Sequence, residues 1–256
     1  NRRYIMKILV IGDKGTDIFS YGECNRICPE APVPVFTPVY QTENEGMAGN
    51  LYRNLLGLLS KKDSITLLSN PEAITKTRLV DLKSNQMLVR VDTDDSCRRV
   101  SKQDLDNALA SEWDAVVVSD YNKGFLLEED IEYILEKSKL TFIDTKKQIG
   151  DWIIKADFIK INSTEYSTNQ KAFLELENRL TGELIVTLGG EGVKWRDSII
   201  KPKSKIQALD VSGAGDTFLA GLVYRYLESR SIEQALVYAN SCAQEIVQQK
   251  GVGTLN

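Results

Sequence analysis

Short apolar runs separated by helix-like segments constrain the fold of this chain most strongly. The runs are four residues long, and segments such as Asp104–Trp113 and Glu128–Ser138 lie between them. Strands that alternate with helices usually pair in parallel, and helices cover both faces of their sheet. The sequence therefore predicts an α/β fold with a three-layer α/β/α sheet, whose strands include Ile8–Ile11, Ala115–Val118, Leu140–Ile143, Phe158–Ile161 and Leu184–Thr187.

Two stretches break this alternation and predict a small β-flap, or lid, over the main sheet. They have strand-like patterns but no crossover helix, and Lys83–Asn85 has the composition of a hairpin turn. We expect lid strands from about 21–45 and 75–93, inserted on a single domain that spans residues 1–256. After Gly12 we expect a polar loop. The expected flap strands are Val35–Tyr40, Thr75–Leu82 and Gln86–Asp92.

A turn of small residues, Gly213-Ala-Gly215, stands directly before a segment with helical periodicity. Free N–H groups and the positive end of the helix dipole face one spot there, and glycine lets a phosphate approach the backbone closely. Asp216 follows the turn and can take a proton from a hydroxyl held nearby. The pattern indicates phosphoryl transfer, although the same turn also occurs as a plain connection between a loop and a helix.

Composition excludes several other chemistries. The 256 residues include no histidine, so a triad that uses His and a zinc site with His ligands are both excluded. The four cysteines are scattered, and Cys24 and Cys28 lack a second pair that would complete a zinc site. The formal net charge is −4, with no long apolar run and no P-loop motif. We therefore expect a cytoplasmic protein with no nucleic-acid or membrane partner.

Several longer strings resemble the ribokinase/PfkB family of carbohydrate kinases. Asp210-Val-Ser-Gly-Ala-Gly-Asp-Thr-Phe218 is similar to the C-terminal signature of that family. The strings Ile27–Val35 and Gln86–Asp92 resemble a branch of it, the bacterial heptose-7-phosphate kinases that feed lipopolysaccharide synthesis. The resemblance runs from Ile8 to Thr254. It implies a ribokinase-like fold and transfer of the γ-phosphate of ATP, with Mg²⁺, to a hydroxyl of a sugar phosphate; a monovalent cation such as K⁺ is a further candidate cofactor.

The resemblance also implies roles for residues that match the family's motifs. Asp216 would be the catalytic base, and the amides of Gly213, Ala214 and Gly215 would form the anion hole. The residues that would bind the sugar phosphate are Asp17, Gly46, Asn50, Arg78, Arg90, Asp120 and Lys123. Those that would bind the nucleotide are Lys146, Asn162, Glu165, Thr187, Gly189, Gly192, Asn240 and Gly253, with Glu165 holding Mg²⁺ through water.

The chain departs from the family pattern in two places. Met47 stands where the family usually has the second of two adjacent glycines, which restricts a hinge of the flap, and the stretch between Leu58 and Thr75 lacks a strand–helix unit.

Residues Asn162–Glu165 are equally a helix cap with a glutamate at its third position.

Three functions therefore stay open. The first is a heptose 7-phosphate kinase, the second is a kinase of another sugar or sugar phosphate, and the third is a non-catalytic sensor of sugar phosphates or nucleotides on the same fold. We also expect a homodimer through the lid, because an exposed strand edge would otherwise be prone to aggregation.

Overall fold

The computed structural model describes residues 5–204, 210–248 and 253–255. Their main sheet has the strand order β12-β11-β10-β9-β8-β7-β1-β4. Strands β4 to β10 in this order are parallel to their neighbours, whereas β11 and β12 are antiparallel at one edge. The strands are β1 (Lys7–Gly12), β4 (Ser64–Ser69), β7 (Ala115–Asp120), β8 (Thr141–Thr145), β9 (Phe158–Asn162), β10 (Glu183–Thr187), β11 (Val193–Trp195) and β12 (Ser198–Ile200). All strands predicted for the main sheet are thus confirmed.

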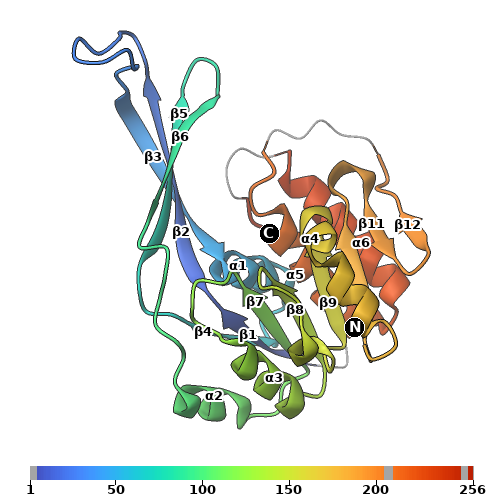
Figure 1. Cartoon of the computed structure of the whole chain (residues 1–256). Helices are drawn as coiled ribbons and strands as arrows, with labels where there is room; N and C mark the ends of the chain where they lie inside the picture. The colour runs from blue at the N-terminus through green and yellow to red at the C-terminus, as the bar shows by residue number, and fades with distance from the viewer. Residues whose placement is uncertain (1–4, 205–209, 249–252, 256) are drawn as a thin grey trace.

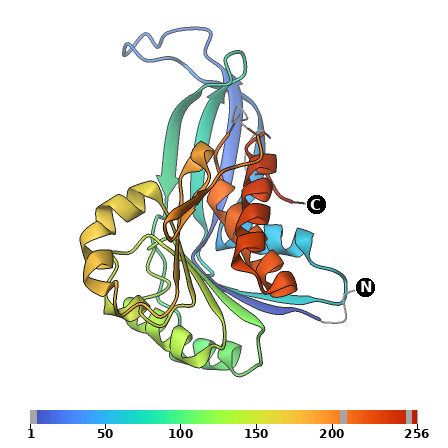
Figure 2. The same ribbon diagram turned by 90° about the vertical axis from the view of Figure 1, so that its right-hand side faces the viewer.

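Helices cover both faces of this sheet and make three layers (Figure 2). Successive side chains of a strand point to opposite faces, so Ile8 and Val10 pack into one apolar cluster, whereas Leu9 and Ile11 pack into the other. No described helix is long and apolar enough to cross a membrane. One face carries α1 (Ala48–Leu58), α5 (Ala214–Ser229) and α6 (Ile232–Ile246), and the other carries α2 (Lys102–Leu109), α3 (Glu128–Lys137) and α4 (Ser163–Leu176).

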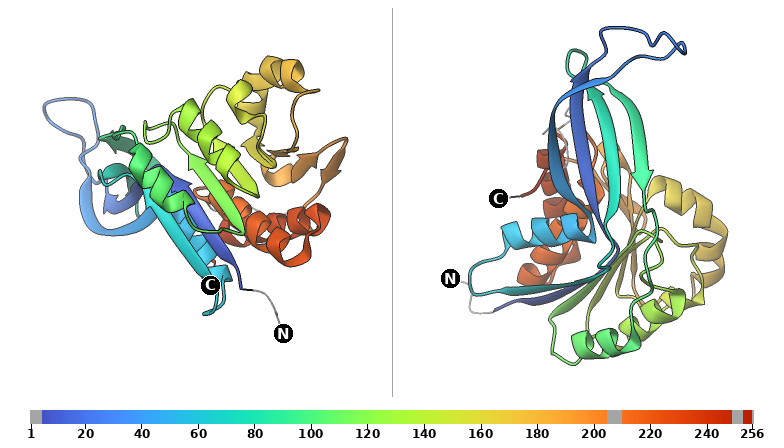
Figure 3. Two further views of the ribbon diagram at one scale, coloured as in Figure 1. Left: turned by 90° about the horizontal axis from the view of Figure 1, so that it is seen from below. Right: turned by 90° about the vertical axis from the view of Figure 1, so that its left-hand side faces the viewer.

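The flap is a second, four-stranded sheet that rises from one side of the body (Figures 1 and 3). Its order is β3-β2-β5-β6, and its strands are β2 (Lys14–Glu23), β3 (Thr37–Met47), β5 (Ile74–Asp81) and β6 (Met87–Thr93). The prediction of a polar loop after Gly12 is therefore wrong, and the flap begins at Lys14. The inner face of β2 holds a carboxylate, Asp17, next to the aromatic Phe19. This strand therefore lacks the apolar alternation by which a strand is recognised in a sequence.

A short turn joins β4 directly to β5, where the family pattern would place a further strand and helix. The buried Asn70 closes this turn. Its side-chain oxygen accepts from the Lys14 N–H at 2.6 Å, and its amide donates to the Glu72 carbonyl at 2.9 Å. The shortened connection thus ties the start of β2 to the start of β5.

Candidate active site

Asp216 lies in the first turn of α5, at the carboxyl end of the sheet. Its side chain is buried, and two donors from other elements hold it. Asn50 Nδ2 donates to Oδ2 at 2.9 Å, and the Tyr121 hydroxyl donates to Oδ1 at 2.7 Å. Burial raises the pKa of Asp216 to about 6, although both hydrogen bonds act to lower it. A carboxylate with this pKa is ionised near neutral pH and still basic enough to accept a proton.

Asn50 and Tyr121 are themselves held in fixed orientations. Asn54 Nδ2 donates to Asn50 Oδ1 at 2.9 Å, which leaves the Asn50 amide nitrogen facing the carboxylate. The backbone N–H of Tyr121 donates to Asp13 Oδ2 at 2.6 Å. Burial raises the pKa of Tyr121 well above its ordinary value, so its hydroxyl keeps its proton. The direction of the Asp216 carboxylate is therefore set by α1 and by the loop after β7.

The turn before Asp216 forms a cradle for an anion. Gly213 has φ 78°, a backbone conformation that favours glycine. Among the described residues the N–H groups of Gly213 and Gly215 have no acceptor, whereas the Ala214 N–H makes a long bond of 3.3 Å to the Val211 carbonyl. A Cβ on Gly215 would stand 3.0 Å from the Lys160 ammonium nitrogen, so a buried positive charge lies directly behind the turn.

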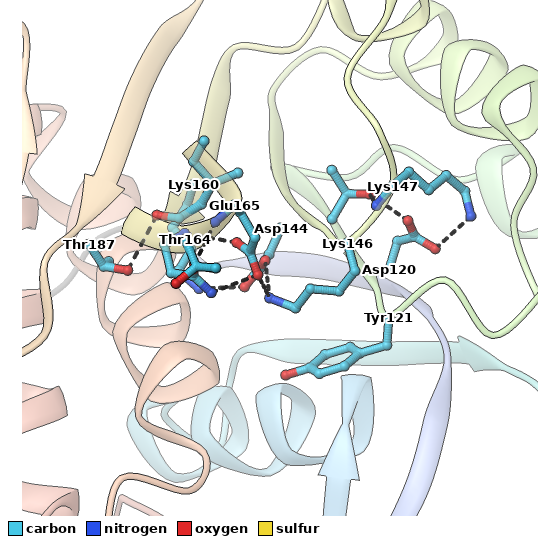
Figure 4. A network of polar contacts seen from close by, with 12 residues as sticks. Asp120, Tyr121, Asp144, Lys146, Lys147, Lys160, Thr164, Glu165 and Thr187 are labelled. Atoms are coloured by element: carbon cyan, nitrogen blue, oxygen red, sulfur yellow. Dashed lines mark hydrogen bonds and ion pairs between the residues drawn. The ribbon is translucent and has the colours of Figure 1, made fainter. Parts of the chain in front are cut away.

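Lys160 belongs to a network of charged groups at the ends of β8 and β9 (Figure 4). Its ammonium pairs with Asp144, which also accepts from Lys146 Nζ at 3.4 Å. Burial alone would raise the pKa of Asp144, but the two ammonium groups lower it. Lys146 also pairs with Glu165 and lies 5.3 Å from the centre of the Tyr121 ring. Burial would lower the pKa of Lys146, but the two carboxylates outweigh it and raise this pKa.

Asn162 and Glu165 form the helix cap that the sequence allowed as an alternative. Asn162 Oδ1 accepts from the Glu165 N–H at 2.9 Å, and Glu165 Oε2 accepts from the Asn162 N–H at 2.8 Å. Glu165 Oε1 accepts from Asn162 Nδ2 at 2.7 Å and also pairs with Lys146. The cap thus fixes the Glu165 carboxylate beside the Lys146 ammonium.

Asp120, the last residue of β7, makes contacts with the end of β8 and the segment that follows β8. It is 1% exposed, accepts from Thr145 Oγ1 at 2.5 Å and pairs with Lys147 at 3.2 Å. Figure 4 shows that the neighbours Lys146 and Lys147 extend in opposite directions, the first toward Glu165 and the second toward Asp120. These contacts hold Asp120 within the body of the protein, and its predicted contact with the sugar stays a prediction.

The flap brings Asp17, Gly46 and Arg78 together. Arg78 Nη1 donates to Asp17 Oδ1 at 2.5 Å, and its guanidinium lies 4.9 Å from the centre of the Phe19 ring. A Cβ on Gly46 would stand 2.5 Å from Asp17 Oδ2, so a larger residue there would displace this carboxylate. Arg90, which pairs in register with Arg78, is half exposed and bonds mainly to its own strand.

Met47 ends β3 at the hinge of the flap. It has φ 56° and ψ −132°, a conformation that favours glycine, and its side chain is buried. The backbone of this chain therefore keeps the glycine-like turn although a methionine stands there.

A cavity of about 350 Å³ lies next to the N-terminus of α5, where Ala214 and Gly215 form part of its wall. Six residues predicted for the nucleotide site or the anion hole line it, together with apolar residues such as Phe218 and Val247 and polar ones such as Gln244. Asn240 donates to the Ile200 carbonyl at 3.0 Å at its edge. The predicted residues in the lining are Ala214, Gly215, Thr187, Gly189, Gly192 and Asn240.

Other residues predicted for the nucleotide do not line this cavity. Lys146, Asn162 and Glu165 lie in the charged network, which reaches the cavity through Lys160 and Gly215. Gly253 is buried but absent from the lining, and the preceding residues Gly251 and Val252 fall outside the described residues.

The carboxylates near Lys146 fit a Mg²⁺ ion that the protein holds through few ligands of its own. The described residues contain no group of three or more His, Cys, Asp or Glu side chains that could hold a metal ion. Asp144 and Glu165 offer carboxylate oxygens on both sides of Lys146. Mg²⁺ usually keeps several waters and binds to one or two carboxylates together with substrate phosphates, so these residues suit it.

Comparison with known proteins decides the family. A sequence profile described as "pfkB family carbohydrate kinase" matches residues 66–256. The chain belongs to the pfkB family of carbohydrate kinases. The bifunctional protein HldE of a Nitratiruptor species is 30% identical over an alignment of 290 positions. This alignment covers 97% of this chain and 63% of that protein. The chain therefore spans less than two thirds of the length of this relative.

Solved structures show the same fold in other members of this group. Phosphofructokinase-2 from Escherichia coli, in complex with potassium, has a TM-score of 0.73 at 12% identity and covers 97% of this chain and 94% of its own. Ribokinase from Arabidopsis thaliana, complexed with ribose and ATP, has a TM-score of 0.68 at 16% identity with the same coverage. At these identities the likeness establishes the ribokinase-like three-layer fold alone.

Sequence reasoning missed three residues of the site. Tyr121 has no role in the sequence-based predictions, although its hydroxyl donates to the candidate base Asp216. Lys160 and Asp144 form a buried ion pair behind the cradle. A signal for the pair existed, because a lysine within the apolar run Phe158–Ile161 needs a buried partner.

Proposed function

We propose that this protein is a kinase that transfers the γ-phosphate of ATP to a hydroxyl of a sugar phosphate, with heptose 7-phosphate as the first candidate acceptor. One observation carries the proposal. Asp216 follows Ala214 and Gly215, which line the cavity, and it accepts from Asn50, which lies in α1 directly after the flap strand β3. A donor phosphate in the cavity and an acceptor hydroxyl under the flap would therefore meet at one carboxylate.

On the acceptor side, Asp17 and Asn50 would bind sugar hydroxyls. A carboxylate accepts from two neighbouring hydroxyls, which suits the position of Asp17 on the inner face of the flap. Asp216 would accept the proton of the attacking hydroxyl as its oxygen bonds to the γ-phosphorus of ATP and the bond to the leaving ADP oxygen breaks. Asn50 and Tyr121 would keep the carboxylate aimed at that hydroxyl during the transfer.

On the donor side, positive groups converge where charge grows on the transferring phosphoryl. The N–H groups of Gly213 and Gly215, at the start of α5, have no acceptor among the described residues, and the Lys160 ammonium lies behind them. Lys146 would stabilise the donor phosphates from the charged network. Mg²⁺, held through water by Glu165, would neutralise charge on the phosphates when bound.

The choice of acceptor rests on the flap and on the relatives. Arg78 and Arg90 occupy one register pair of the flap, and arginine is well suited to bind a phosphate with two parallel hydrogen bonds. The relatives named bifunctional protein HldE and the motif resemblance to heptose-7-phosphate kinases support a phosphorylated heptose. A related phosphofructokinase in complex with potassium supports K⁺ as a candidate cofactor.

We also propose a homodimer through the flap. Several apolar side chains of its strands are exposed, among them Val39, Val89 and Val91. Covering them with a second copy would remove this apolar surface from water. Sedimentation at dilute concentration should show a dimer, and a monomer alone would contradict this part of the proposal.

A panel of sugars and sugar phosphates, assayed with ATP by release of ADP, tests the function. We expect turnover with heptose 7-phosphate and a loss of about 10²–10⁴-fold in kcat for Asp216→Asn with ATP binding retained. Turnover with a different sugar would support phosphoryl transfer from ATP but contradict heptose 7-phosphate as the acceptor. Binding of sugar phosphate or nucleotide without any turnover would instead support the sensor function.

A further inference from the structure

Two lysines from different parts of the chain converge on one carboxylate between the flap and the body. Lys76 lies on β5 of the flap, and Lys123 lies in the loop that follows β7 of the body. Lys76 Nζ is 3.6 Å from Asp95 Oδ1, and Lys123 Nζ is 2.5 Å from Asp95 Oδ2. Asp95 therefore bridges two ammonium groups that would otherwise face each other.

Both lysines belong to the walls of the proposed acceptor site. Lys76 pairs in register with Asp17, so the two side chains share the inner face of the flap. Lys123 stands two residues after Tyr121, whose hydroxyl binds Asp216. The ammonium groups thus lie on the same side of the molecule as the groups that would hold the sugar.

The cations are more enclosed than the anion that neutralises them. The side chains of Lys76 and Lys123 are each 17% exposed, whereas that of Asp95 is 43% exposed. Asp95 lies after the end of β6, in a segment without regular structure, and its carboxylate can rotate into solvent. Lys123 is held more firmly, because its carbonyl accepts from the Cys97 N–H at 2.8 Å.

We infer that Lys76 and Lys123 form a binding site for the phosphate group of the acceptor, which Asp95 occupies when no acceptor is bound. A phosphate monoester carries more charge than a carboxylate and has three acceptor oxygens, so it can bind both ammonium groups at once. Asp92, 3.6 Å from Lys76 Nζ, would remain as the second partner of that lysine. This inference rests on the proposed function, since it explains how a phosphorylated sugar would be preferred over the free sugar.

Binding of inorganic phosphate tests the site without any catalysis. We would titrate phosphate by calorimetry into the wild-type protein and into Lys76→Gln, Lys123→Gln and Asp95→Asn. Each lysine variant should weaken binding by about tenfold or more, the loss expected for one charge-assisted hydrogen bond. Asp95→Asn should tighten binding by about two- to fivefold, because it removes a competing ion pair at a partly exposed site.

Lys83→Gln, at the flap hairpin, is the matched control and should leave phosphate binding unchanged. A merely structural salt bridge predicts the opposite for Asp95→Asn, namely no gain in binding. Phosphate binding that is equal in the wild type and both lysine variants would place the anion elsewhere and overturn the inference.

Kinase kinetics separate this inference from the proposed function. With a phosphorylated acceptor, Lys76→Gln should raise the KM for the acceptor by about tenfold and leave the KM for ATP unchanged. An active kinase whose acceptor KM is insensitive to both lysines would overturn only the phosphate site. An inactive protein whose phosphate binding depends on both lysines would overturn only the kinase.

Discussion

Replacing Tyr121 by Phe removes one of the two hydrogen bonds that hold the candidate base. The phenyl ring keeps its place beside Lys146, and only the donation from the hydroxyl to Asp216 Oδ1 is lost. That bond favours the ionised carboxylate, so its loss raises the pKa of Asp216. Asn50 continues to donate to Oδ2, and the charges of Asp144 and Lys160 are unchanged.

The size of the effect follows from the energy of such a bond. A hydrogen bond to a charged group contributes about 1.5–3 kcal/mol, and part of it survives when the carboxyl is protonated. A remaining difference of about 1.4 kcal/mol corresponds to one pKa unit. With a starting pKa of about 6, the ionised fraction of Asp216 at pH 6 falls about fivefold in the variant, whereas at pH 7 it falls only about twofold.

The assay is the pH profile of kcat/KM, which reports the pKa of the essential base in the free enzyme. We expect the acid limb of Tyr121→Phe to move upward by about one pH unit, with rates that approach the wild type at alkaline pH. Tyr133→Phe, which removes a similar bond to Asp106 on the surface, is the control and should not move the limb. An acid limb of Tyr121→Phe at the wild-type position would refute the role given to this hydroxyl.

Three further predictions concern single positions. Because burial raises the pKa of Asp216 from 3.8 to about 6, its ionisation costs stability as pH rises through this range. Urea unfolding should show the stability of Asp216→Asn relative to wild type growing by about 2.4 kcal/mol between pH 4 and pH 7, and a constant difference would contradict this reasoning. Gly46→Ala places a Cβ against Asp17 and should raise the acceptor KM by about tenfold or more with an unchanged KM for ATP in initial-rate kinetics; an unchanged acceptor KM would argue against Asp17 as a ligand. Gly192 has φ 105°, and a Cβ there would stand 2.2 Å from a backbone carbonyl, so Gly192→Ala should destabilise the fold by about 1–3 kcal/mol in urea unfolding. The control Gly190→Ala has open space around its Cβ and should cost less than about 1 kcal/mol. Equal costs for the two variants would contradict backbone strain at Gly192.

Much of the α/β body could be predicted because its signals are local. Each central strand is an apolar run buried on both faces, and the segments between the runs have helical periodicity. The flap was harder to delimit. Strand β2 carries polar residues such as Asp17 on a face that covers the site rather than the core, so its pattern resembles that of a solvated loop.

Individual side chains of the site were harder to assign than its elements. Asn162 and Glu165 were recognised as a pair, but the same spacing encodes a helix cap, and the cap is what their contacts show. Asp120 ends strand β7 and Tyr121 follows it, and nothing in their order indicates which side chain contacts Asp216. In the folded chain Asp120 pairs with Lys147, and the Tyr121 hydroxyl donates to Asp216.

The cradle and the base are properties of a short segment, and the rest of the site is not. Gly213, Gly215 and Asp216 are neighbours in the chain, so the positive φ, the free N–H groups and the acid at a helix start follow from local sequence alone. The groups that give Asp216 its pKa are remote, since Asn50 is 166 positions away and Tyr121 is 95 positions away. Burial and hydrogen bonding depend on which strand ends meet in space, and that depends on the packing of the whole sheet and its helices.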